Sequence, residues 1–179
     1  MINELIKYDT KFNEGMFKSY IDNIFVKLYT AIMLDDLESI NHFLSDDLYK
    51  KYKLKLDELN SKNLTEMYDE LNVKSSEIVN IDITDTEFII TVKLISRYIN
   101  YFINKNTGTY ISGNNKSRIE KINTLIFKKN RDYKNQNNIR RCPGCGASID
   151  VNNNGVCAYC KTTYNLEQYD YILDDLMVS

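Results

Sequence analysis

Residues 79–94 read VNIDITDTEFIITVKL, and this stretch decides the fold class. Apolar and polar residues alternate from Val79 to Ile83, which is the period of a half-buried β-strand. Residues 85–86 mark a turn, and the alternation resumes at Phe88. The stretch therefore predicts a β-hairpin with one face on a core.

The second strand of this hairpin is long. Its apolar pattern continues from Phe88 to Ile103, so we expect a bend or a bulge near Ser96 and Arg97, as a curved sheet requires. Further strands are predicted at residues 110–111, which follow a turn at 106–108, and at residues 119–127. Residues 169–173 alternate as well and predict a last strand, with a short helix as the alternative.

The residues before this sheet follow a helical period instead. Asn13 is expected to cap a helix whose apolar positions run from Phe17 to Ile32. The apolar arc of this helix is wide, which is typical of a core helix or of a helix that meets a second surface.

Two shorter helices are expected next. The first covers residues 37–44, and Ser45 caps the second, whose apolar side lies within residues 48–59. Asp46 and Asp47 would stabilise that second helix, because negative charges interact favourably with the positive end of the helix dipole. Residues 61–72 are expected to form a loop or a broken helix. Helices followed by antiparallel strands predict an α+β fold.

The cysteines form a C-x2-C-x11-C-x2-C array near the C-terminus. They are the only cysteines of the chain: Cys142, Cys145, Cys157 and Cys160. Asn154 and Gly155 between the two pairs predict a hairpin turn. Two thiolate pairs on tight turns predict a zinc ribbon, because Zn²⁺ prefers a tetrahedral cage of such ligands.

We expect this site to be structural, since four thiolates leave no position for water or substrate. Iron is the alternative metal, and a redox disulfide would need only one pair. Gly146 suits the backbone geometry that follows the first pair, whereas Lys161 follows the second. The single histidine, His42, is not expected to be a ligand because no cysteine lies near it in sequence.

Composition excludes some classes of protein. The net charge is −2, which gives no overall attraction for nucleic acid or membrane. No apolar run approaches the roughly 18 residues of a membrane-spanning helix, and the start does not resemble a secretory signal. We therefore expect a cytoplasmic protein with reduced thiols. The basic run at residues 128–141 is interpreted as a solvated hairpin extension, with anionic lipid, RNA or an acidic partner as alternatives.

Several short motifs occur in the order of a known family. They are FNEGMF (12–17), NIFVKL (23–28), DLESI (36–40), FLSDDLY (43–49), RYINY (97–101), TG (107–108), SG (112–113), TLIFKK (124–129) and YDYIL (169–173). Together they resemble the Tim44-like domain family, named after a subunit of the mitochondrial inner-membrane translocase. Leu125 stands where the family has a Trp.

The resemblance implies a fold and a class of function. It implies helices packed on a curved antiparallel sheet, like the cone of nuclear transport factor two, with an apolar pocket. It implies a scaffold that binds protein or lipid, without a catalytic residue set. Enzymes also occur on this cone fold, and Asp82, Tyr98 and Tyr101 are the residues we expect to line such a pocket.

The tail after the ribbon suggests how the two modules are joined. Residues 164–179 are too rich in apolar side chains for a solvated end. We therefore predict that the ribbon, residues 139–164, is an insertion, and that residues 1–138 and 165–179 form the cone. The strand at residues 124–129 should run out to the ribbon, and residues 169–173 should return antiparallel beside it.

The sequence thus predicts a non-enzymatic, zinc-containing interaction module, associated with protein transport or the membrane periphery. Its expected partner is a protein segment or anionic lipid. A nucleic-acid-binding zinc ribbon is the alternative, suggested by Arg140 and Arg141 beside the cysteines. An enzyme that acts on a small apolar substrate in the cone is the third hypothesis.

Overall fold

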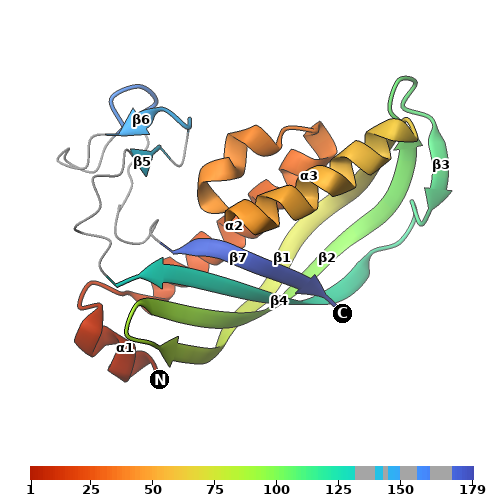
Figure 1. Cartoon of the computed structure of the whole chain (residues 1–179). Coiled ribbons are helices and arrows are strands. Elements are labelled where there is room, and N and C mark those ends of the chain that lie inside the picture. The colour runs from red at the N-terminus through yellow and green to blue at the C-terminus, as the bar shows by residue number, and fades with distance from the viewer. Residues whose placement is uncertain (132–139, 143–144, 150–156, 162–170) are drawn as a thin grey trace.

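The computed structural model describes residues 1–131, 140–142, 145–149, 157–161 and 171–179. Figure 1 shows the helices first in the chain and the strands after them. The helices are α1 (Ile2–Tyr8), α2 (Glu14–Leu34), the 3-10 helix η1 (Leu37–Phe43) and α3 (Asp46–Ser61). The strands are β1 (Leu64–Ile83), β2 (Glu87–Asn104), β3 (Tyr110–Gly113), β4 (Ile119–Asn130), β5 (Arg140–Arg141), β6 (Ser148–Ile149) and β7 (Ile172–Val178).

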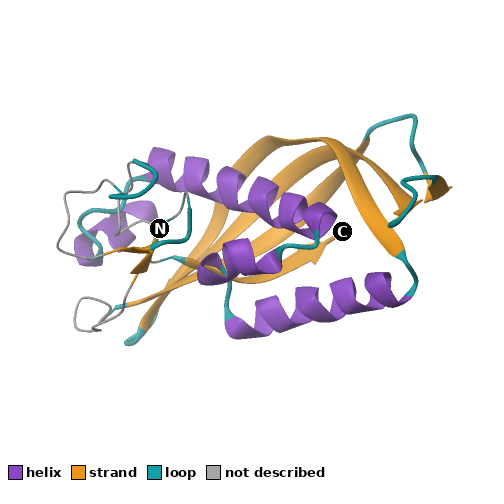
Figure 2. Cartoon of the chain, turned by 90° about the horizontal axis from the view of Figure 1, so that it is seen from above, coloured by secondary structure: helices purple, strands orange, loops and turns teal. Residues whose placement is uncertain are grey.

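The main sheet is open, curved and antiparallel. Its strand order is β1-β2-β4-β7, with β3 beside β2, and β5 and β6 form a separate pair. Figure 2 shows α2 and α3 over the same face of the sheet. The predicted α+β class, with N-terminal helices on a curved antiparallel sheet, is confirmed.

Side-chain caps begin the helices where the sequence predicts them. Asn13 Oδ1 accepts a hydrogen bond of 2.9 Å from the Met16 amide at the start of α2. Ser45 Oγ accepts one of 3.2 Å from the Leu48 amide at the start of α3. Each bond satisfies an amide that lacks a partner in the first turn of a helix, which fixes where the helix begins.

The expected loop or broken helix at residues 61–72 is wrong, because β1 already begins at Leu64. The pairing of β1 with β2 shifts register at three places, which are 69/72, 73/75 and 78/80. Each extra residue in a bulge reverses the alternation of side chains. The first half of β1 therefore lacks the sequence pattern of a strand.

Of the bend or bulge expected in β2 near Ser96 and Arg97, the bulge lies in its partner β1, whereas β2 itself is curved (Figure 1). The pairing of β2 with β4 runs without a shift from Glu87 to Tyr98. Two of the β1 irregularities lie directly opposite Ser96 and Arg97. The sheet thus takes its irregularities on an edge strand, where bulges also hinder pairing with another chain.

The last strand, β7, completes the main sheet. It pairs antiparallel with β4, so that Leu176 lies opposite Leu125 and Leu173 opposite Phe127. This confirms that the chain returns beside residues 124–129. The strand begins at Ile172, later than predicted, and residues 169–170 lie outside the described part of the chain. The predicted ribbon boundaries, at 139 and 164, also fall there and stay a prediction.

The outer edge of β7 is closed by the start of α3. The amide of Ser45 donates to Leu173 O (2.9 Å), and its hydroxyl donates to Asp174 O (3.2 Å). Lys51 Nζ donates to Leu176 O (3.0 Å). These bonds occupy carbonyl groups that an edge strand would otherwise offer to another chain.

A buried polar cluster joins the N-terminal segment to β4 and to the residue before β7. Lys129 Nζ lies 2.9 Å from Asp9 Oδ2, and the side chain of Lys129 is 1% exposed. The Tyr171 hydroxyl donates to the same Asp9 oxygen at 2.9 Å. The Tyr20 hydroxyl donates to Tyr171 O at 2.6 Å. We call Asp9, Lys129 and Tyr171 the clasp.

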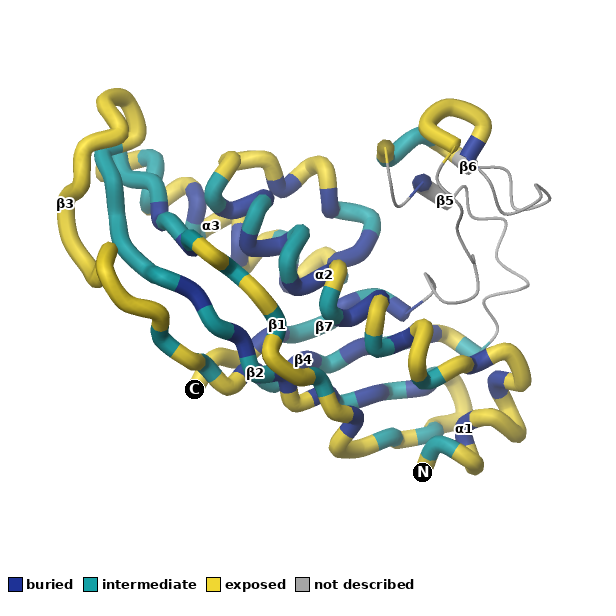
Figure 3. Tube along the Cα trace, turned by 180° about the vertical axis from the view of Figure 1, so that it is seen from behind, coloured by how far each residue is buried: buried dark blue, intermediate teal, exposed yellow. Residues whose placement is uncertain are grey.

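Aromatic rings surround the clasp and continue it into the core. The Phe17 ring lies 5.1 Å from that of Tyr171 and 5.4 Å from that of Phe127. Lys129 Nζ lies 5.0 Å from the centre of the Tyr171 ring. Figure 3 shows buried residues on the strands and on the sides of the helices that face them. The clasp is therefore part of the main core.

The clasp predicts a large loss of stability when one charge is removed. Asp9→Ala leaves the ammonium of Lys129 buried without its carboxylate, which costs about 3–5 kcal/mol in comparable pairs. We expect urea unfolding to show a loss of that size. Asp47→Ala is the matched control, because the Asp47 side chain is 95% exposed, and loss of its favourable place at the start of α3 should cost at most about 1 kcal/mol. Equal effects of the two substitutions would contradict the role of the clasp.

A second prediction concerns β7. Deletion of residues 165–179 removes Tyr171, Leu173 and Leu176, each 2% exposed or less. Burial of one such side chain contributes about 1.5–3 kcal/mol, so the truncated chain should lose cooperative thermal unfolding. Removal of Ser179 alone should leave the transition intact. An unchanged transition after the longer deletion would show that β7 is dispensable.

Candidate metal centre

The first cysteine pair lies on a tight turn between β5 and β6. The Cys142 amide donates to Ala147 O (2.7 Å), and the Gly146 amide donates to Cys142 O (2.8 Å). Gly146 has a φ of 72°, a left-handed conformation that costs glycine little because it lacks Cβ. This turn places the sulfurs of Cys142 and Cys145 on one side.

The second pair lies on a turn of the same kind. The Lys161 amide donates to Cys157 O at 3.0 Å. Lys161 has a φ of 61°, so it takes the left-handed position that Gly146 takes in the first turn. Its ammonium donates to Ala158 O at 3.0 Å, a bond within the turn that supports this conformation. The absence of glycine after the second pair therefore does not change the shape of the turn.

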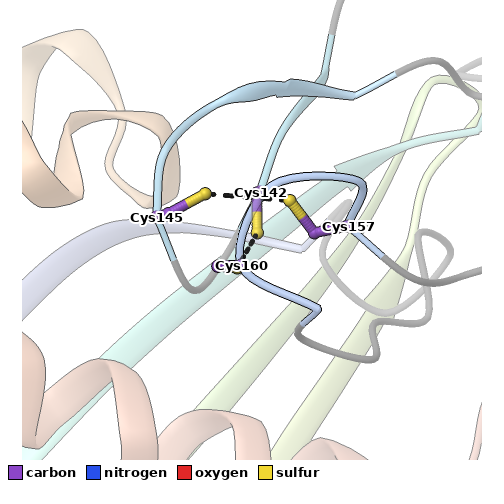
Figure 4. A group of neighbouring side chains, drawn as sticks. All are labelled: Cys142, Cys145, Cys157 and Cys160. Carbon is purple, nitrogen blue, oxygen red and sulfur yellow. Dashed lines mark hydrogen bonds between the residues drawn. The ribbon is translucent and has the colours of Figure 1, made fainter.

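The four sulfurs meet in one cluster, drawn in Figure 4. All four Sγ atoms lie within 4.8 Å of one another. Cys142 Sγ lies 3.5 Å from Cys160 Sγ, and Cys145 Sγ lies 3.7 Å from Cys157 Sγ. A tetrahedral zinc with sulfur at about 2.3 Å places its ligands about 3.8 Å apart. The donor set and its spacing therefore fit a metal ion, and the sequence-predicted ligands are brought together.

Backbone amides support two of the sulfurs. The amides of Cys160 and Tyr159 act to lower the pKa of Cys157. The amide of Ala147 acts in the same direction on Cys145, but burial and the neighbouring thiols leave the pKa of Cys145 above its usual value. The bond from the Cys160 amide is the main reason that the pKa of Cys157 lies below its usual value. Amides directed at sulfur stabilise thiolate, which is the form that binds metal.

A cation of the helical layer lies near the cluster. Burial lowers the pKa of Lys27 on α2, and the charge of the Cys142 thiolate opposes that shift. Lys27 Nζ lies 5.4 Å from the centre of the Phe43 ring. Four thiolates around a divalent ion carry a net charge of −2. A nearby ammonium therefore favours the loaded site, and sequence reasoning missed this residue because 115 positions separate it from Cys142.

The three residues expected to line a catalytic pocket do not come together. Tyr98 is buried on the side of β2 that faces the helices. Asp82 is exposed and accepts a hydrogen bond from Asn80. Tyr101 lies on the other face of β2 by alternation, and its hydroxyl donates to Asp69. The expectation of a shared site for these residues is not met.

A tyrosine cluster occupies the helix-facing side of β1 and β2. The rings of Tyr29 and Tyr68 lie 4.6 Å apart, and those of Tyr68 and Tyr98 lie 5.3 Å apart. Lys55 donates to the Tyr68 hydroxyl (2.9 Å) and lies 2.6 Å from Glu66 Oε2. The sequence does not reveal this cluster, because the bulges of β1 interrupt the alternation that would mark residues 66–68 as part of a strand.

The protonation of these tyrosines argues against a role in base catalysis. Burial, with a smaller contribution from Glu66, raises the pKa of Tyr98 to about 12. Burial also raises the pKa values of Tyr29 and Tyr68. All three hydroxyls therefore stay protonated at neutral pH, whereas a general base needs a pKa near the working pH. The cluster serves as a packed, hydrogen-bonded part of the core.

The described part of the basic run is occupied within the protein. Lys128 pairs with Asp174 at 2.8 Å, and Lys129 belongs to the clasp. Arg131 donates to Thr84 O at 2.6 Å, and its guanidinium lies 5.0 Å from the centre of the Tyr8 ring. These cations hold the end of β4 to its neighbours. Residues 132–139 and the side chains of residues 140–141 lie outside the described part.

The fold and the cluster define a class of protein: an α+β domain, with helices on an open antiparallel sheet, that carries a four-cysteine cluster late in the chain. The chain belongs to the Tim44-like domain family, whose model matches residues 1–138. The match covers the elements from α1 to β4 and ends before the cysteine cluster. No curated protein matches the chain.

Two further findings concern the described residues. None of their helices combines the length and the apolar character needed to cross a membrane. Within the described residues, the four cysteines are the group in which three or more potential metal ligands lie close together. His42 is outside this group, and its ring lies 4.0 Å from that of Phe43.

The cluster predicts that metal binding and local folding are linked. A module of this size has little core of its own, so metal binding supplies most of its folding free energy. We expect chelation, or Cys145→Ser, to increase hydrogen exchange at the described ribbon residues 140–142, 145–149 and 157–161. Amides of β2 and β4 should keep their protection.

Tyr159→Ser is the matched control, because Tyr159 lies between two of the cysteines but its side chain is 76% exposed. This variant should exchange like the parent chain. Loss of protection throughout the main sheet on chelation would contradict the independence of the two parts.

Proposed function

We propose that the protein is a non-enzymatic interaction module of the protein-transport or membrane-associated type, in which a structural zinc ribbon accompanies a domain that binds a protein segment. Family membership supports the general class, because Tim44-like domains act as interaction modules. The observation that carries the choice of partner is the sheet face opposite α2 and α3. In Figure 1 no helix or strand of the described chain lies over the centre of this face.

The uncovered face combines apolar side chains with backbone that is fully paired. Ile122 lies opposite Ile95 on β2, and Thr124 lies opposite Met177 on β7. Ile122 is 45% exposed and Met177 is 46% exposed. Exposed apolar residues that cluster on one face are typical of surfaces that bind proteins. We call Ile95, Ile122, Thr124 and Met177 the open face.

Charge favours a protein partner over anionic lipid. Two cations near the open face are ion-paired, Lys128 with Asp174 and Arg97 with Glu120 at 3.2 Å. A third, exposed Lys93, lies opposite Thr124 and has Glu77 as its cross-strand neighbour on β1. The net charge of the chain is −2. Adsorption to anionic lipid needs several unpaired cations, each worth about 1 kcal/mol near the surface. The same pairing removes support for nucleic-acid binding, which depends on cations that neutralise phosphates.

The zinc ribbon is proposed to be structural. Its four thiolates would complete the coordination of one zinc ion and leave no position for a substrate. The ribbon would then stabilise the connection between β4 and β7 and present its surface, without taking part in chemistry.

The proposal predicts site-specific crosslinking to a protein. A photoreactive phenylalanine analogue at Thr124 should give a discrete adduct of reproducible mass in lysate from the source cells. The crosslinked protein, once identified and purified, should bind the parent chain directly. The substitution Ile122→Asp should weaken this binding at least tenfold. The same analogue at Lys50, whose side chain is 73% exposed on α3, is the matched control and should give no such adduct.

Liposome flotation separates the alternatives. Vesicles that contain anionic lipid should leave the protein unbound at physiological salt. Salt-sensitive flotation without a protein adduct would replace the protein partner with lipid. Absence of both results would refute the proposed function.

A further inference from the structure

The cysteine cluster has an arrangement that suits oxidation as well as metal binding. We propose that it is a peroxide-responsive thiol switch, in which oxidation links Cys142 to Cys160 and Cys145 to Cys157 and so releases the bound metal. This inference goes beyond the proposed function and does not depend on the partner of the open face.

Two sulfur–sulfur contacts suggest the pairs. Cys142 and Cys160 have sulfurs 3.5 Å apart, and Cys145 and Cys157 have sulfurs 3.7 Å apart. Each cysteine pair lies on one turn, which we call a knuckle: Cys142 and Cys145 on the first, Cys157 and Cys160 on the second. Both contacts join one knuckle to the other, as the dashed lines in Figure 4 show. A disulfide bond is about 2.05 Å long. The two knuckles therefore need to approach each other by less than about 2 Å for both bonds to form.

Each pair combines an accessible sulfur with a protected one. Cys145 and Cys160 are exposed, whereas Cys142 is 0% and Cys157 is 2% exposed. Oxidation by a small reagent begins at accessible thiolates. The exposed member of each pair is thus the site of attack, and its buried neighbour is the thiolate that resolves the product.

The chemistry is balanced with hydrogen peroxide as the oxidant. The Cys145 thiolate attacks one oxygen of the peroxide, the O–O bond breaks, and a sulfenic acid and hydroxide form. The Cys157 thiolate then attacks the sulfenic sulfur, forms the S–S bond and expels a second hydroxide. The same two steps at Cys160 and Cys142 consume a second peroxide. Four thiolates lose four electrons in total, and two peroxides become four hydroxides.

Loss of metal follows from the change in the ligands. A thiolate is an anionic donor, whereas a disulfide sulfur carries no charge and binds zinc poorly. The two bridges are nested, with Cys142–Cys160 outside Cys145–Cys157 in sequence. The outer bridge joins the two chain segments that lead from β4 and back to β7. Oxidation therefore exchanges one cross-link between these segments for another, while chelation leaves none.

This exchange has a measurable consequence for the main domain. A cross-link lowers the entropy of the unfolded chain between its ends. The zinc-loaded and the oxidised forms should unfold at similar temperatures, and the chelated, reduced form should unfold several degrees lower. The variant with both Cys157→Ser and Cys160→Ser cannot link the two segments, so it should unfold like the chelated parent with or without peroxide.

The direct test is a map of the bridges in the full chain. Zinc-loaded protein is treated with two equivalents of hydrogen peroxide, zinc release is followed with a chromogenic chelator, and remaining thiols are alkylated. The digestion cuts before Asp150, after Arg141 and Lys161 and after Tyr159, so that Cys157 and Cys160 lie in different peptides. Fragmentation between Gly144 and Cys145 then assigns both bridges.

The expected result is release of one zinc per chain, loss of four thiols, and the bridges 142–160 and 145–157. A reductant with added zinc should restore the starting form. Bridges within the knuckles, 142–145 and 157–160, would overturn the proposed pairing. Retention of zinc and thiols under this treatment would overturn the switch itself. In Cys160→Ser the 145–157 bridge should still form, and its absence would also count against the pairing.

Discussion

The ion pair between Lys129 and Asp9, bonded also by Tyr171, holds together parts of the chain that are distant in sequence. Lys129 is near the end of β4, Asp9 follows α1, and Tyr171 precedes β7. A buried charge is tolerated only when a partner and hydrogen bonds replace its hydration. The three residues therefore stabilise one another's burial. The clasp sets where β4 ends and where the chain returns to the sheet.

This constraint explains how a cysteine ribbon can sit between two neighbouring strands of one sheet. The chain leaves β4 at Asn130 and re-enters the sheet at Ile172, and the two strands pair directly. The clasp holds the end of β4 next to the start of β7 on the core side of the sheet. The ion pair between Lys128 and Asp174 joins the same two strands. The main domain thus holds both ends of the ribbon segment independently of the metal. A metal ion bound to the four cysteines would fix the middle of the same segment.

Local signals in the sequence predicted much of the fold. Asn13 and Ser45 cap their helices because their side chains replace a missing backbone partner within three residues. The alternation from Phe88 to Leu94 indicates a strand with one buried face. The spacing of the cysteines indicates four ligands of a single metal ion. Each of these signals depends on residues that are close together in the chain. The ligand cluster was predictable for the same reason, since each turn positions its own two sulfurs.

Features that depend on distant residues were not predictable. The bulges of β1 interrupt its alternation, so that residues 64–72 read as a loop although β2 pairs with them. Asp9 and Lys129 are separated by 120 positions, and nothing near either residue marks it as buried. Asp82 and Tyr101 were grouped with Tyr98 from a fold-level analogy, but strand alternation and a turn place them on other surfaces.

We propose that one metal ion, held by four cysteines, organises the segment between β4 and β7. X-ray diffraction from crystals of the full chain, recorded on both sides of the zinc and iron absorption edges, would identify this ion and its ligands. We expect a single anomalous peak that appears at the zinc edge, surrounded at about 2.3 Å by the sulfurs of Cys142, Cys145, Cys157 and Cys160. A peak with oxygen or nitrogen ligands, or four cysteines that do not share a metal in metal-supplemented crystals, would show that the cysteines do not hold the segment in this way.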